Sequence, residues 1–134
     1  MASKKGRILC VEDNEDACDI LGHVLADYEV VPAMTFAEGL RLAKSEHFDL
    51  YLLDRTYPDG DGLELCRQLR AFDKQTPILF HSASGRESEI RDAITAGAQE
   101  YLVKPIGITE LEDSVERLIG SLATPALLKH GYAS

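Results

Sequence analysis

The 134-residue sequence has no tryptophan, only three cysteines and no long hydrophobic run. Cys10, Cys18 and Cys66 are odd in number and form no C-x-x-C pair, so the sequence predicts neither a disulfide framework nor a zinc site. Each lies in an apolar stretch, and we expect it to be a small buried hydrophobic residue. The first apolar run, residues 8–11, stops at Glu12, which is too short for a signal peptide, and no run approaches the ~20 residues of a membrane span. We therefore expect a cytoplasmic protein without a membrane partner.

Positive charge is also scarce. The chain has 14 Lys and Arg against 23 Asp and Glu, a formal net charge of −9. An acidic surface repels nucleic acids, so we expect no direct nucleic-acid partner. Hydrophobic residues make up 45% of the chain, which excludes a wholly disordered protein. The length suits one domain, which we expect over residues 1–122, with a short tail at 123–134.

Short apolar runs alternate with longer amphipathic segments along the chain. The apolar runs predict strands at 8–11, 28–33, 49–53, 77–80 and 101–103. The amphipathic segments predict helices at 15–27, 35–43, 63–72, 84–97 and 109–122. Thr35, Ser84 and Thr109 each begin a capping-box pattern, Pro32 favours an edge position for the second strand, and residues 57–62 have the composition of a turn.

Five strands in strict alternation with five helices predict an α/β fold. Such a pattern is typical of right-handed βαβ units and a parallel sheet with helices on both faces. The strands are continuously apolar, as expected for a sheet that is buried on both sides. If the spatial order of the strands is 2-1-3-4-5, the first and third strands are neighbours at the point where the order reverses.

Polar residues follow four of these strands. Glu12 and Asp13 follow the first, Asp54 the third, Ser82 the fourth and Lys104 the fifth. Because ligands of such sheets bind at the carboxyl ends of the strands, we expect these side chains to meet. Three converging carboxylates repel one another, and Mg²⁺ would relieve that repulsion. A hydroxyl and an ammonium group beside them would suit a phosphoryl group, so the pattern predicts a phosphoryl-transfer site.

Each piece also has an ordinary structural explanation. The acid pair could favour a helix N-terminus, Asp54 could begin an Asx turn, Ser82 could be a turn residue and Lys104 could lie in a solvated loop. Four such coincidences at four strand ends are less plausible than one shared site. For Tyr101, a purely structural buried aromatic remains the alternative to a functional role.

In these residues the sequence resembles the receiver domain of two-component response regulators, over about residues 5–122. The resemblance implies a (βα)5 flavodoxin-like three-layer sandwich with strand order 2-1-3-4-5. It also implies that Asp54 accepts a phosphoryl group from a phosphohistidine donor. Asp13, Asp54 and the backbone carbonyl of Thr56 would hold Mg²⁺ or Mn²⁺ directly, and Glu12 would act through a metal-bound water.

The resemblance assigns further roles on the two outer strands. Ser82 would donate a hydrogen bond to one phosphoryl oxygen, and Lys104 would pair with another. Tyr101 matches the family's switch aromatic, which would turn inward when Ser82 moves toward the phosphate. His81 precedes the hydroxyl residue, and strand alternation places it on the opposite face, so we expect it to be packed rather than catalytic.

The sequence departs from the family's pattern after Asp54. Arg55 occupies a position that is usually apolar, and Tyr57 and Gly60 replace two methionines of the following turn. Arg55 is therefore a candidate for a partner contact or for an unusual salt bridge near the site. Thr56 and Ser84 stand at the positions that tune dephosphorylation in the family.

The function implied is a phosphorylation-switched signalling domain without an external substrate and without an output domain in this chain. Its donor would be a sensor histidine kinase or a histidine phosphotransfer protein, and a downstream protein would bind the last two helices and the strand between them. A phosphorylation-dependent homodimer is left open. The alternatives are a phosphorylation-independent interaction module, a receiver fragment of a hybrid kinase and, less favoured, an aspartyl phosphatase, because Thr56 stands where those enzymes carry a second Asp.

Overall fold

The computed structural model describes residues 4–123. Twelve helices and strands follow one another in this part of the chain. They are β1 (Arg7–Val11), α1 (Glu15–Val24), β2 (Glu29–Ala33), α2 (Phe36–Ser45), β3 (Leu50–Leu53), β4 (Thr56–Tyr57), β5 (Gly60–Asp61), α3 (Gly62–Phe72), β6 (Ile78–Ser82), α4 (Glu87–Ala96), β7 (Glu100–Val103) and α5 (Ile108–Ala123). The predicted tail falls outside the described residues from position 124 onward.

Five of the strands form one parallel sheet in the order β2-β1-β3-β6-β7. Counted among these five strands alone, this is the order 2-1-3-4-5, so the predicted topology is confirmed. β2 lies at an edge, where Pro32 needs no backbone N–H to donate to a further strand. The order reverses between β1 and β3, and the carboxyl ends of these neighbouring strands therefore open onto the same edge.

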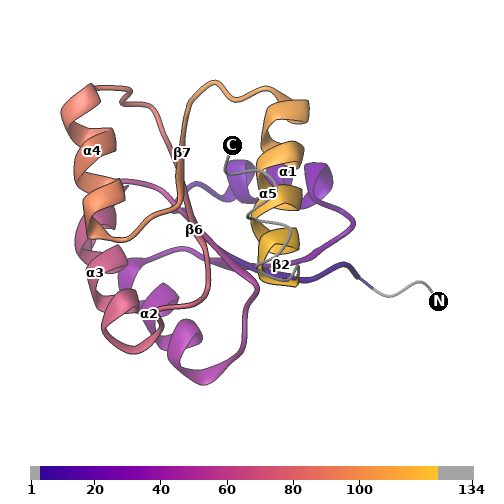
Figure 1. Cartoon of the computed structure of the whole chain (residues 1–134), viewed down its shortest axis with the longest axis horizontal. Coiled ribbons are helices and arrows are strands. Elements are labelled where there is room, and N and C mark those ends of the chain that lie inside the picture. Colours follow the sequence, from indigo (N-terminus) through magenta and orange to yellow (C-terminus); the bar gives the residue numbers. More distant parts are fainter. Residues whose placement is uncertain (1–3, 124–134) are drawn as a thin grey trace.

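Helices cover both faces of the sheet, with α2, α3 and α4 on one side and α1 and α5 on the other (Figure 1). Alternate residues of each strand serve the two faces: in β1, Leu9 and Val11 pack toward α2 and α3, whereas Ile8 and Cys10 pack toward α1 and α5. These four side chains have no exposed surface, which explains the continuously apolar strand. All three cysteines are buried free thiols, as expected.

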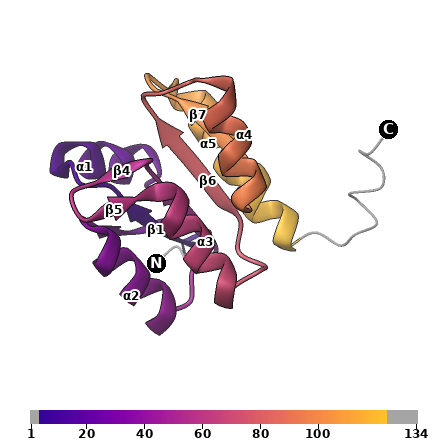
Figure 2. The same cartoon turned by 90° about the vertical axis from the view of Figure 1, so that its left-hand side faces the viewer.

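Residues 56–61 form a small antiparallel hairpin of β4 and β5 just before α3 (Figure 2). The composition of these residues predicted only a turn, so the predicted count of five strands lacks the two short strands of this hairpin. Gly62 follows it at a point where a Cβ atom would overlap the carbonyl oxygen of Asp54. A glycine is therefore required for the hairpin to lie against the end of β3.

The three predicted capping boxes have different outcomes. The Thr35 side chain accepts a hydrogen bond from the Glu38 N–H, so the cap of α2 is confirmed. The other two predictions are wrong. α4 begins three residues after Ser84, whose hydroxyl instead hydrogen-bonds the carboxylate of Glu89, and α5 begins before Thr109.

The ends of α4 and α1 can be compared with the predicted helix ends. α4 is followed by Gly97, whose φ of 122° lies in the region that favours glycine, so the predicted end near this residue is confirmed. α1 ends at Val24, three residues earlier than predicted, because the next residues turn to bury Leu25 and Tyr28. Across the part of the chain that the structure describes, no helix combines the length and apolar character that a bilayer crossing requires.

Candidate functional site

A cleft of about 590 Å³ opens at the carboxyl ends of the central strands. Its walls are formed by the loops after β1, β3, β6 and β7 and by the β4–β5 hairpin. The lining residues are Asp13, Asp54, Arg55, Thr56, Gly60, Asp61, Ser82, Ala83, Ser84, Glu89 and Lys104. All the predicted site residues except Glu12 and Tyr101 are among them. The topology thus brings together residues that lie up to 91 positions apart between Asp13 and Lys104.

Lys104 lies between two carboxylates at this cleft. Its Nζ is 2.9 Å from Asp54 Oδ2 and 3.3 Å from Glu12 Oε1. Burial alone would lower the pKa of Lys104, but the hydrogen bond and charge of Asp54 and the charge of Glu12 raise it above the ordinary value. Burial raises the pKa of Glu12, and the Asn14 N–H and Lys104 act in the opposite direction. An ammonium group that stays charged therefore balances two acids, one of which has almost no contact with water.

The Asp54 carboxylate is held in place from two directions. Oδ1 accepts a hydrogen bond from the Arg55 N–H at 2.6 Å, and Oδ2 faces Lys104. The Asp54 N–H donates to Tyr57 Oη at 2.7 Å, and the Tyr57 hydroxyl donates to the Val11 carbonyl at 2.9 Å. Tyr57 is 4% exposed, so this hairpin side chain is a buried brace between β3 and β1. In the sequence Tyr57 stands out only as a departure from the family's pattern, and nothing there indicates this role.

The sequence predicted that Glu12, Asp13 and Asp54 meet at one magnesium ion, and Glu12 and Asp54 both contact Lys104. Within residues 4–123, no group of three or more Asp, Glu, His or Cys side chains is placed to hold one metal ion. Glu12 is 2% exposed and its Oε2 accepts a hydrogen bond from the Asn14 N–H, so it is turned into the protein. Asp13, Asp54 and Thr56 line the open cleft, and two carboxylates with a carbonyl oxygen are ligands that Mg²⁺ accepts when waters complete its shell.

Ser82 ends β6 at the cleft and is 4% exposed. Its Oγ accepts a hydrogen bond from the Ser84 N–H at 3.3 Å. The Tyr101 hydroxyl donates to the Ser84 carbonyl at 2.7 Å, and its ring stacks on Phe80 with centroids 5.8 Å apart. Tyr101 therefore contacts the loop that carries the serines, although it does not line the cleft.

Arg55 extends from the end of β3 to the first turns of α4. Its Nη1 donates to the Glu89 carbonyl at 3.3 Å, and its Nε lies 3.9 Å from Asp61 Oδ1. The side chain is only 15% exposed, and Nε is buried without a hydrogen-bond partner among the described residues. Arg55 thus makes a long ion pair near the site, one of the two possibilities raised from the sequence, and adds a second cation to the cleft.

His81 lies behind the site, on the face of the sheet that packs against α1 and α5. It is 2% exposed and contributes to an apolar groove of about 190 Å³ between these helices. Its Nε2 is 3.9 Å from Glu12 Oε1, and burial together with the Lys104 charge lowers its pKa to about 4. The prediction that it is packed on the face opposite Ser82 agrees with this position, but its approach to Glu12 was not foreseen.

The cleft therefore presents a carboxylate beside an ammonium, a guanidinium and a hydroxyl group, an arrangement suited to an anionic group that carries several oxygens. A family model described as the response regulator receiver domain matches residues 8–116. The chain belongs to this family. The recognition made from Glu12, Asp13, Asp54, Ser82 and Lys104 is confirmed.

Curated relatives of this receiver domain are response regulators. The transcriptional regulatory protein PrrA of Mycobacterium tuberculosis is 37% identical over 123 residues, which cover 88% of this chain and 53% of that protein. The KDP operon transcriptional regulatory protein KdpE of Escherichia coli is 39% identical over 107 residues, 78% of this chain and 47% of that protein. The chain spans about half the length of these relatives.

Solved receiver structures share the fold. A CheY-like receiver domain protein of Methanospirillum hungatei superposes with a TM-score of 0.84 at 27% identity, covering 91% of this chain and 98% of that one. The non-phosphorylated HemR receiver domain of Leptospira biflexa gives a TM-score of 0.80 at 35% identity, with 86% and 94% covered. The predicted flavodoxin-like α/β class is confirmed.

Proposed function

We propose that this receiver domain accepts a phosphoryl group on Asp54 and thereby switches its contacts with other proteins. The observation that supports this most directly is the Asp54 carboxylate itself, which lies in the cleft with Lys104 at 2.9 Å and with Ser82 in the same wall. A carboxylate in this setting is a nucleophile beside groups that stabilise phosphoryl oxygens.

The donor is a phosphohistidine of a sensor histidine kinase or of a histidine phosphotransfer protein. An Asp54 oxygen attacks phosphorus, the P–N bond breaks, and the imidazole leaves with that electron pair and takes up a proton. Lys104 exchanges its contact with Glu12 for a phosphoryl oxygen, and the Ser82 hydroxyl donates to another. The product is an acyl phosphate that hydrolyses slowly within the same site, so the domain turns over no external substrate.

Asp13, Asp54 and the Thr56 carbonyl are the residues that would hold Mg²⁺ or Mn²⁺, and Glu12 would contribute from behind them. When bound, the ion would neutralise charge on the phosphoryl oxygens. Without it, the carboxylates of Asp13 and Asp54 repel an anionic donor, which is why we propose that the reaction requires a divalent cation.

Phosphorylation alters the charge at the cleft by about −1.5 to −2. The groups that would respond are already linked to α4 and β7: Arg55 through the Glu89 carbonyl, and Tyr101 through the Ser84 carbonyl. A shift of this network would alter the surface of α4, β7 and α5, where Ile94 is 45% exposed. A change of about 1–3 kcal/mol in the free-energy difference between the two states would suffice for signalling.

The output is a downstream protein that binds this surface, and a homodimer of the phosphorylated form is a second use of it. The relatives PrrA and KdpE are named as transcriptional regulators, and a hybrid signal transduction histidine kinase of Dictyostelium discoideum is 35% identical over 118 residues. These names support the role that we propose here, which is cytoplasmic signalling between a kinase and an effector.

Acetyl phosphate with Mg²⁺ tests the proposal, with intact mass spectrometry as the readout. The parent and the control Asp92→Asn, on the exposed side of α4, should each gain one phosphoryl group, and Asp54→Asn should gain none. Removal of divalent cations with a chelator should abolish the gain. Equal labelling of Asp54→Asn and the parent would overturn the proposed phosphoacceptor.

A further inference from the structure

The ends of β1 and β3 are joined differently from the ends of β1 and β2 or of β6 and β7. Just past β1, the Glu12 N–H donates to the Ala33 carbonyl of β2 at 2.9 Å. Just past β7, the Lys104 N–H donates to the Ser82 carbonyl of β6 at 2.8 Å. Each is a direct backbone bond of the kind that continues a parallel ladder. β1 and β3 are linked at this level through a side chain, the Tyr57 hydroxyl of the hairpin.

The Tyr57 hydroxyl occupies the place of a ladder bond. Val11 of β1 is paired with Leu53 of β3, so the next bond of a regular ladder would run from the Asp54 N–H to the Val11 carbonyl. Both groups bond the Tyr57 oxygen, which accepts from the Asp54 N–H at 2.7 Å and donates to the Val11 carbonyl at 2.9 Å. Burial raises the pKa of Tyr57 well above its ordinary value, so the hydroxyl keeps the proton that it donates. The spacing of the two strand ends therefore depends on this buried side chain.

The same side chain is connected to each segment that carries a proposed metal ligand. The Thr56 carbonyl belongs to the peptide bond between Thr56 and Tyr57. Asp54 bonds the hydroxyl through its own N–H, and Asp13 lies two residues after the Val11 carbonyl. Asp13, Asp54 and Thr56 all line the cleft. Tyr57 lies behind the cleft wall, so its route to a cation there is through the placement of these ligands.

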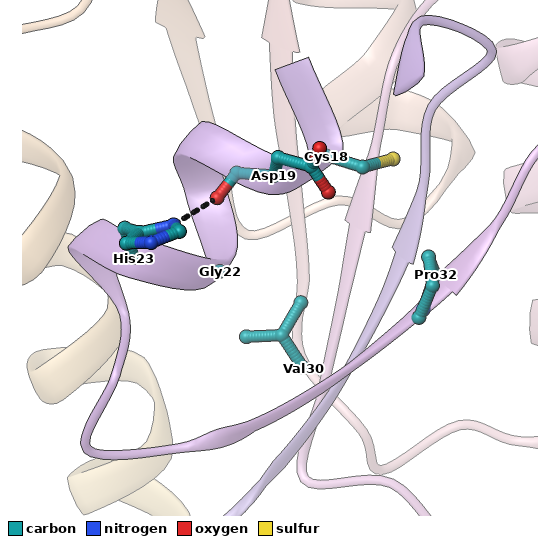
Figure 3. A pocket seen from close by; sticks show the side chains of 6 residues that line it. All are labelled: Cys18, Asp19, Gly22, His23, Val30 and Pro32. Carbon is teal, nitrogen blue, oxygen red and sulfur yellow. Dashed lines mark hydrogen bonds between the residues drawn. The ribbon is translucent and has the colours of Figure 1, made fainter. Parts of the chain in front are cut away.

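The segment that carries Asp13 is fixed on its other side by β2 and α1. The Glu12 N–H bonds the Ala33 carbonyl, and the Glu12 carbonyl accepts a hydrogen bond from Cys18 Sγ at 3.4 Å. Figure 3 shows Cys18 on α1 with its sulfur directed toward the strands, beside a cleft of about 310 Å³ between α1 and β2. Since one side of this segment is held in this way, the Tyr57 hydroxyl sets its spacing from β3 on the other side.

We propose that Tyr57 is a positioning residue whose hydroxyl sets the spacing of Asp13 and Asp54 and thereby the affinity of the cleft for Mg²⁺ or Mn²⁺. Partners that hold metal ligands from behind change metal affinity by about 10–100-fold. Without the hydroxyl, the Asp54 N–H and the Val11 carbonyl either pair directly, which draws the strand ends together, or stay unpaired, which frees them. Both outcomes lower the affinity. This role rests on the proposed function, because it takes Asp13, Asp54 and Thr56 as the ligands.

Titration of the unphosphorylated full chain with Mn²⁺ tests this role without any reaction, because the electron paramagnetic resonance signal of free Mn²⁺ reports the unbound ion. The parent should bind the ion, Asp13→Asn should lose most of the affinity, and Tyr57→Phe should bind about tenfold more weakly. Tyr51→Phe is the matched control, because Tyr51 is also buried and its hydroxyl donates to the Asp73 carboxylate at 2.7 Å, beyond the C-terminal end of α3. Its affinity should stay within about twofold of the parent's.

Equal affinities of Tyr57→Phe and the parent would overturn the proposal, and so would a loss of the same size in Tyr51→Phe. Amide hydrogen exchange of the parent decides the question even if Tyr57→Phe does not fold. Coupling between two events is reciprocal, so an ion that depends on the hydroxyl bridge must also protect it, and saturating Mg²⁺ should slow exchange of the Asp54 amide about tenfold. The Gln75 amide, which donates to the Asp73 carboxylate, is the control and should keep its rate. An Asp54 amide that also keeps its rate would overturn the proposal.

Labelling by acetyl phosphate separates this role from the proposed function. The Mg²⁺ concentration that half-saturates the labelling rate should be about tenfold higher for Tyr57→Phe, whereas the rate at saturating Mg²⁺ should stay within about threefold of the parent's. A lower saturating rate with unchanged half-saturation would overturn the positioning role. Failure of the parent to bind Mn²⁺ through Asp13, or to accept phosphate at Asp54, would overturn the proposed function instead.

Discussion

Lys104→Met removes the cation that lies between Asp54 and Glu12. Its Nζ is 2.9 Å from one carboxylate and 3.3 Å from the other, and no other ammonium of residues 4–123 lines the cleft. Loss of one preorganised group that stabilises transition-state charge costs about 10²–10³ in rate. We therefore expect the initial rate of Asp54 labelling by acetyl phosphate to fall by about this factor.

The same substitution has a smaller effect on stability. Breaking a fully buried ion pair costs about 3–5 kcal/mol. The Lys104 side chain is 34% exposed, and Glu12 can take up a proton once its partner is gone. We therefore expect the free energy of unfolding to fall by only about 1 kcal/mol. Burial already raises the pKa of Glu12, and loss of Lys104 raises it further. The loss of unfolding free energy should then be larger at about pH 8, where Glu12 must ionise, than at about pH 5.

The assay pairs the initial labelling rate with urea unfolding at both pH values. Lys74→Met is the control, because Lys74 lies beyond the far end of α3, where it donates a hydrogen bond to the Arg70 carbonyl. It should leave both the labelling rate and the pH dependence unchanged. A labelling rate of Lys104→Met within about twofold of the parent would refute the argument that charge neutralisation at this cleft carries the reaction.

Three further predictions follow from buried or crowded positions. Burial lowers the pKa of His81 from 6.5 to about 4, so the unfolded chain binds a proton at a pH where the folded chain does not. The free energy of unfolding should therefore be highest above pH 6.5 and should be lower by about 2 kcal/mol at about pH 5. Urea unfolding of His81→Leu should lack this loss. Gly62→Ala should destabilise the fold by about 1–3 kcal/mol, since its methyl group meets the Asp54 backbone. Gly22→Ala lies in open space and should stabilise the fold by about 0.5–1 kcal/mol. A higher melting temperature for Gly62→Ala than for Gly22→Ala would contradict the packing described. Arg55→Met removes a positive charge from the cleft, so the initial rate of labelling by an anionic donor should fall roughly threefold to tenfold. Arg55→Lys keeps the charge and should slow labelling much less. Equal initial rates for both variants and the parent would exclude a role of this charge.

The sheet and its order could be predicted because both are encoded locally. Residues 8–11 and 50–53 are continuously apolar, which indicates strands buried on both faces, and the residues that follow them are acidic. Parallel topology then brings the strand ends to one edge without any knowledge of side-chain direction. The cleft that contains Asp13, Asp54 and Lys104 follows from these two facts alone.

Side-chain direction could not be predicted in the same way. Glu12 and Asp13 are adjacent, yet one is buried against Lys104 and the other lines the open cleft, since neighbouring residues after a strand leave it on different sides. Tyr57 becomes a brace between β3 and β1 only because the hairpin folds back on the sheet. Ser84 has the sequence of a helix cap, but it lies in the loop before α4 and hydrogen-bonds the Glu89 carboxylate on that helix. Each outcome depends on contacts between distant segments, which a local pattern does not carry.

The central claim is that the Asp54 carboxylate forms an acyl phosphate. Reduction with borohydride converts an acyl phosphate into an alcohol and leaves free carboxylates intact, so it marks the modified position permanently. After treatment with acetyl phosphate and Mg²⁺, peptide mapping should find homoserine at position 54 and unmodified carboxylates at Glu12 and Asp13. Reduction at either of those acids, or phosphate retained on a serine with position 54 unchanged, would contradict the account.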